Sequence, residues 1–73
     1  MNIEVKRLHL HTFWGKESLE RKAMVYHVNA GYYEVDFYKL DKIVETRKMI
    51  TDGVIHSESY AESAAENWCM GIM

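Results

Sequence analysis

The feature that most constrains the fold is the contrast between the last seventeen residues, 57–73, and the chain before them. Residues up to about 50 alternate between apolar and polar side chains, as β-strands do. The later segment instead has helical periodicity, and its apolar stripe consists of Ala61, Ala64, Ala65 and Trp68. Alanines let a helix pack closely on a sheet, so the pattern predicts a small layered α+β domain.

We predict an antiparallel four-stranded meander sheet (order β-β-β-β-α) with one C-terminal helix packed on one face, in a single domain spanning residues 1–73. The expected strands are 2–12, 21–28, 32–39 and 42–50, with a first connection at 13–20. In the first strand, apolar residues occupy odd-numbered positions up to Val5 and even-numbered positions at Leu8 and Leu10, so they point to opposite faces. Either a bulge near Lys6 and Arg7 or burial of both faces would explain the change.

Turn residues predict two hairpins. Asn29-Ala30-Gly31 is a three-residue loop with Gly31 left-handed, which pairs Val28 with Tyr32. The core face of this hairpin then carries Ala23, Val25, His27, Tyr33, Val35 and Phe37.

Leu40-Asp41 is a two-residue turn that pairs Lys39 with Lys42. Continued without interruption, this register places Phe37 opposite Val44, Val35 opposite Thr46 and Glu34 opposite Arg47. It also sets Asp36 opposite Glu45, an unfavourable pair of like charges.

For the helix we expect about eleven residues, with Trp68 packed on Val35, Phe37 and Val44. Ser59 and Glu62 form a capping box, Ser57 is an alternative N-cap, and Gly71 is the residue after the C-cap.

A chain of 73 residues with a single cysteine, Cys69, has neither an intramolecular disulfide nor a cysteine pair for structural zinc. Hydrophobic residues make up 48% of it, more than a monomer of this size can bury. We therefore expect self-association, as a homodimer.

Charge is distributed unevenly along the chain. Residues 1–50 hold all nine Lys and Arg against seven acids, whereas residues 51–73 hold four acids and no Lys or Arg. The basic excess is too small to indicate nucleic acid. The charged N-terminus does not resemble a signal peptide, and no apolar run is long enough to span a membrane. A lone thiol fits a reducing compartment, so we expect a cytoplasmic protein.

His9 and His11 are the candidate metal ligands. At positions i and i+2 of a strand they would point the same way, and His27 could join them from a neighbouring strand. No Asp, Glu or Cys has an evident place as a further ligand. A solvated strand edge explains the pair equally well, so we predict no metal site.

No pattern supports an enzyme. Cys69 lies at a helix C-terminus, where the dipole disfavours a thiolate, and is expected to pack in the core. Glu58, Glu62 and Glu66 are typical of a solvated helix face. The chain contains no phosphate loop or nucleophile elbow, so we expect neither catalysis nor a cofactor.

The outward face of the sheet is the candidate binding surface. It would gather tyrosines with a methionine, an isoleucine and a lysine, namely Lys22, Met24, Tyr26, Tyr32, Tyr38 and Ile43. Scattered surface aromatics are the alternative interpretation. Sheets backed by helices also bind DNA, as in the arm domains of tyrosine recombinases, but Glu34, Asp36 and Glu45 on this face argue against it.

Three segments, 33–38 (YEVDFY), 43–47 (IVETR) and 59–68 (SYAESAAENW), resemble short uncharacterised proteins of tailed bacteriophages that infect marine cyanobacteria. The resemblance covers about two-thirds of the chain and includes no catalytic signature. It implies a viral protein made in the cytoplasm of a bacterial host and acting by binding a host protein. Our leading hypothesis is therefore a non-enzymatic protein-binding domain that uses its sheet face or edge, ahead of a nucleic-acid-binding module and a metal-dependent regulator.

Overall fold

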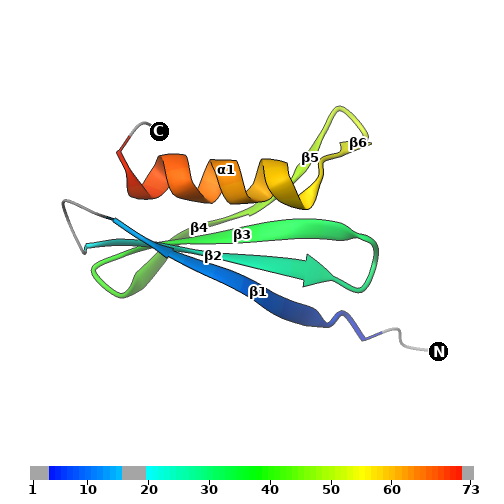
Figure 1. Ribbon diagram of the computed structural model, residues 1–73. Helices are drawn as coiled ribbons and strands as arrows, with labels where there is room; N and C mark the ends of the chain where they lie inside the picture. Colours follow the sequence, from blue (N-terminus) through cyan, green and yellow to red (C-terminus); the bar gives the residue numbers. More distant parts are fainter. Residues whose placement is uncertain (1–3, 16–19, 72–73) are drawn as a thin grey trace.

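Four antiparallel strands form a sheet in chain order, and one helix lies across one of its faces (Figure 1). The computed structural model describes residues 4–15 and 20–71, and the predicted α+β meander is confirmed over them. The elements are β1 (Arg7–Trp14), β2 (Arg21–Val28), β3 (Tyr32–Lys39), β4 (Lys42–Lys48), β5 (Ile50–Thr51), β6 (Val54–Ile55) and α1 (Glu58–Cys69).

Both predicted hairpin turns are confirmed. Gly31 has φ +104°, and its N–H donates to the carbonyl of Val28 at 2.9 Å. At the next turn Leu40 and Asp41 have φ of 52° and 63°. Positive φ at both central residues is the twist that a two-residue hairpin requires. The β2–β3 register is therefore the one that the turn chemistry predicts.

Strand β1 differs from its expected form. It runs from Arg7 to Trp14, so it starts later and ends later than predicted; residues 2, 3 and 16–19 lie outside the described part. Its register against β2 shifts between His9 and His11, not near residues 6 and 7. The extra residue, Leu10, packs against the core. The change of parity between Val5 and Leu8 is not explained by this bulge, because Val5 precedes the strand and both side chains are exposed.

Strand β4 contains a second bulge, which makes the predicted register wrong beyond Tyr38. Val44 is the extra residue, so Phe37 lies opposite Glu45 and Val35 opposite Arg47. Asp36 then faces Thr46, whose hydroxyl donates to it at 2.8 Å. One inserted residue thus replaces a pair of like charges with a hydrogen bond.

Strand β4 ends at Lys48 rather than Ile50 because Met49 turns into the core. Its side chain is buried, and its N–H donates to the carbonyl of Tyr33 at 2.8 Å. The two-residue strands β5 and β6 follow, as an unpredicted hairpin beside the start of α1 (Figure 1). Asp52 and Gly53 have positive φ at its turn.

Helix α1 has twelve residues and begins after Ser57, the alternative N-cap. The Ser57 hydroxyl accepts a hydrogen bond from the N–H of Tyr60 at 3.2 Å, so the capping box at Ser59 was wrong. Gly71, with φ +78°, follows the C-cap as predicted. No helix within the described residues is long and apolar enough to cross a membrane.

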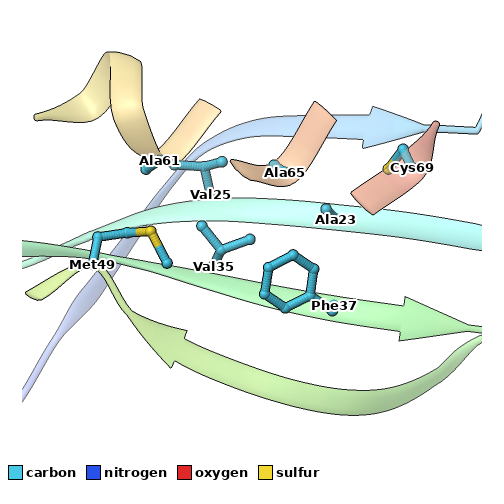
Figure 2. Close-up of a cluster of buried hydrophobic side chains, with 8 residues drawn as sticks. All are labelled: Ala23, Val25, Val35, Phe37, Met49, Ala61, Ala65 and Cys69. Carbon is cyan, nitrogen blue, oxygen red and sulfur yellow. The ribbon is translucent and has the colours of Figure 1, made fainter. Parts of the chain in front are cut away.

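The core lies between α1 and strands β1, β2 and β3 (Figure 2). Its buried members are Ala23, Val25, Val35, Phe37, Met49, Ala61, Ala65 and Cys69. Trp68 contacts Phe37 edge to face at 5.2 Å between ring centroids, as predicted. Val44 was wrongly expected there, since it is the bulge residue and is 53% exposed.

The helix leaves β4 uncovered, and every residue of this strand is exposed. On the helix side of β4, the Arg47 guanidinium lies over the Phe37 ring at 5.2 Å and binds the Glu45 carboxylate through two hydrogen bonds. A charged pair therefore closes this side of the core, where an apolar residue was expected.

Candidate functional site

The sheet face opposite α1, called the outer face below, carries a row of side chains that crosses all four strands. Its members are register partners on β1, β2, β3 and β4: Trp14, Lys22, Tyr38 and Ile43. We call this set the outer row. Trp14 and Ile43 are each 53% exposed. The Lys22 ammonium lies 5.2 Å from the Trp14 ring centroid and 4.6 Å from that of Tyr38, so cation–π contacts join three of the four members of the row.

The other predicted binding residues lie on the same face, farther along the strands. The Tyr26 hydroxyl donates to the Met24 sulfur at 3.7 Å, and the Arg7 guanidinium covers the Tyr26 ring at 3.9 Å. Burial raises the pKa of the Tyr26 hydroxyl. Tyr32 lies beneath Lys48 at 5.5 Å. All six predicted residues are thus on one face, with their aromatic rings paired to cations.

Of the three acids expected on the outer face, Glu34, Asp36 and Glu45, only the first two lie there. Glu34 and Asp36 lie on the outer face, where Arg7 binds them at 3.1 and 2.8 Å. Glu45 belongs to the opposite face, because the β4 bulge sets it against Phe37. Burial alone would lower the pKa of Arg7, but its hydrogen bond to Asp36 and the charge of that carboxylate raise it. The two acids of the outer face therefore share one guanidinium.

Both edges of the sheet carry features that hinder the addition of another strand. The β4 edge has the Val44 bulge and a lysine at each end of the strand, Lys42 and Lys48. The β1 edge has the bulge at Leu10. Bulges and edge lysines are common means of blocking edge-to-edge pairing. Both edges are consequently poorly suited to pairing with another strand.

The β1 bulge separates the two candidate metal ligands, so the expectation that His9 and His11 point the same way was wrong. His9 lies on the outer face, 5.5 Å from the Tyr26 ring, with Nε2 2.7 Å from Thr12 Oγ1. His11 instead faces α1, and its Nε2 is 2.9 Å from Glu62 Oε1. His27 contacts the Tyr33 ring.

Sequence reasoning missed the carboxylates that meet His11. Glu58 Oε2 lies 3.4 Å from His11 Nε2, beside the closer Glu62. The spacing of four residues does show that Glu58 and Glu62 share one helix face. It does not show which strand this face meets, because that depends on how α1 docks on the sheet.

Cys69 packs in the core, as expected. Its thiol donates a hydrogen bond to the carbonyl of Phe13 at 3.3 Å. Burial is the main reason that the pKa of this thiol is raised. The sulfur is therefore held protonated, which is unsuitable for a nucleophile.

No protein-family model matches this chain, and comparisons with curated proteins and with solved structures find no match either.

Proposed function

We propose that the protein is a non-enzymatic binding domain that forms a homodimer through its outer face, with the outer row at the centre of the contact. The observation that carries this proposal is the exposure of Trp14 and Ile43 at the two ends of a row on a sheet face that α1 does not cover. Aromatic residues are enriched at the centres of protein interfaces.

A second copy of the chain suits this face for two reasons. First, a two-fold dimer brings the same surface of both copies together, so that surface must be complementary to its own copy in shape and charge. The outer face has nearly balanced charge: Arg7, Lys22 and Lys48 stand against Glu34 and Asp36. Second, a domain this small gains stability from association where no disulfide supports the core.

A cytoplasmic location and the lack of catalysis belong to the same proposal. The lone cysteine is a buried thiol, which fits a reducing compartment. The phage resemblance would make that compartment the cytoplasm of a bacterial host, with a host protein as the alternative occupant of the outer face.

Sedimentation equilibrium of the wild-type chain tests the dimer. We expect a dimer at micromolar concentration and at least a tenfold weaker association in Tyr38→Glu and Ile43→Glu, since each variant buries a charge in the contact. Val54→Glu is the matched control, because Val54 is 59% exposed on the β5–β6 hairpin, away from the outer face. Circular dichroism checks that the helix content is unchanged.

A wild-type chain that stays monomeric up to about 0.3 mM would contradict the dimer, because specific interfaces of ordinary size bind more tightly than this. A dimer that persists in both variants would show that the outer row is not the contact. The monomeric result would instead favour a different protein as the partner of this face.

Single-stranded nucleic acid is the second candidate, favoured by aromatic rings interleaved with cations on the outer face. Two observations weigh against it. The rings of Tyr26 and Tyr38 are already covered by Arg7 and Lys22, and the face has little net charge. Fluorescence anisotropy with a labelled oligothymidylate measures whether the chain binds single-stranded DNA. Salt-sensitive binding that Trp14→Ala abolishes would support this candidate over the dimer.

A further inference from the structure

Three side chains from two elements bring potential metal ligands together at one point, on the side of the sheet opposite the outer face. They are His11 on β1 and Glu58 and Glu62 in the first half of α1. His11 Nε2 lies 2.9 Å from Glu62 Oε1 and 3.4 Å from Glu58 Oε2. One ligand atom from each residue lies within 4.8 Å of the other two.

These separations suit a shared ion. Nitrogen and oxygen ligands lie about 2.0–2.2 Å from a zinc ion, so two of them at tetrahedral or octahedral angles are roughly 2.8–3.5 Å apart. The His11–Glu62 and His11–Glu58 distances both fall within this range. A modest rotation of one carboxylate would therefore complete a three-ligand arrangement.

The electrostatics also favour a cation. Within residues 4–15 and 20–71, Glu58 and Glu62 form no ion pair with a lysine or arginine, and the side chain that both contact is the imidazole of His11. The chain has no Lys or Arg at all from residue 51 to residue 73. The three side chains are 33–44% exposed, so a hydrated ion can reach them from solvent.

We propose that His11, Glu58 and Glu62 bind a divalent transition-metal ion, of which zinc is the representative. An imidazole with two carboxylates favours zinc and its first-row neighbours over magnesium or calcium, which prefer oxygen ligands alone. The ion joins the start of α1 to β1 and keeps its remaining coordination positions for water. This site is independent of the outer face.

Titration of the full chain with zinc chloride tests the site by isothermal calorimetry and thermal unfolding. At about 1 mM zinc we expect the melting temperature to rise by about 5 °C or more, since an ion that binds only the folded state stabilises it. His11→Gln and Glu62→Gln should each weaken zinc binding by at least about tenfold, because each removes one ligand. The substituted side chains are partly exposed and lie outside the buried core, so these variants should fold.

Two matched control variants make the same substitutions, His to Gln and Glu to Gln, at positions outside the proposed site. His9→Gln alters a histidine on the outer face, and Glu66→Gln alters a carboxylate one helical turn beyond Glu62. Both should bind zinc as the wild type does. The proposal is overturned if zinc leaves the wild-type melting temperature unchanged, since the cluster is then an ion pair only. It is also overturned if His11→Gln keeps full affinity, since the ion then binds elsewhere, for example at His56 or Cys69.

Discussion

Arg7 and Asp36 form an ion pair that spans strand β2, because Arg7 lies on β1 and Asp36 on β3. The distance from Arg7 Nη2 to Asp36 Oδ1 is 2.8 Å, and the carboxylate is only 3% exposed. The Arg7 guanidinium also covers the ring of Tyr26, on the intervening strand β2, at 3.9 Å from the ring centroid. This contact ties three strands together on the outer face and satisfies the most buried charge described in the chain.

Loss of Arg7 should therefore destabilise the fold by more than an ordinary surface change. We expect Arg7→Met to lower the free energy of unfolding by about 2–4 kcal/mol, since among residues 4–15 and 20–71 it leaves Thr46 as the one side chain that is hydrogen-bonded to the buried Asp36 carboxylate. The double variant Arg7→Met/Asp36→Asn removes that charge and should recover part of the loss. Urea denaturation measures both values, and a single-variant cost below about 0.5 kcal/mol would contradict this view of the pair.

Trp68 should be the main anchor of α1. Trp68→Ala removes the edge-to-face contact with Phe37 and should cost about 3–5 kcal/mol, enough to leave the isolated chain largely unfolded at room temperature. Trp68→Phe should cost much less, because it keeps a ring against Phe37 and removes an indole N–H that has no partner within the described residues. Thermal unfolding followed by circular dichroism distinguishes the two. Equal losses in both variants would show that the indole makes a contact that a phenyl ring cannot replace.

The Val44 bulge should be dispensable for strand pairing. Deletion of Val44 leaves Ile43 opposite Tyr38 and Glu45 opposite Phe37, so the hydrogen bond from Thr46 to Asp36 is preserved. We expect the deletion to lower the free energy of unfolding by less than about 1 kcal/mol. Thr46→Val, which keeps the length and removes the hydrogen bond, should cost about 1–2 kcal/mol. The reverse order would show that the bulge itself stabilises the sheet.

The Cys69 thiol should be unreactive in the folded chain. Because burial raises its pKa, less thiolate is present at any given pH, and access is restricted as well. We expect reaction with a disulfide reagent at pH about 8 to be more than tenfold slower in the folded chain than in urea.

The sign of the Cys69 shift also predicts a pH dependence. A pKa that is higher in the folded state stabilises the fold fully below the unfolded value of about 8.5–9 and less at higher pH. Cys69→Ala should therefore lose less stability than the wild type between pH 8 and pH 10. An equal loss in both would show that other groups account for the alkaline change.

Local chemistry in the sequence was enough to predict the meander, both main hairpin turns and the buried stripe of the helix. Gly31 and the Leu40-Asp41 pair determine turns through their own backbone preferences, and Ala61 and Ala65 share a face through helical periodicity alone. These features depend on residues close together in the chain. The outer-face position of Tyr26 and Tyr38 followed from the same local register.

Only the tertiary structure decided where the strands bulge and which side chains meet across the chain. The bulge at Val44 places Thr46 opposite Asp36, and the bulge at Leu10 sends His9 and His11 to opposite faces. The meeting of His11 with Glu62 depends on how α1 docks on β1. Alternation along one strand cannot reveal such features, because a single bulge residue exchanges the two faces of the strand beyond it. The contacts that favour the bulge are made with a different strand or helix.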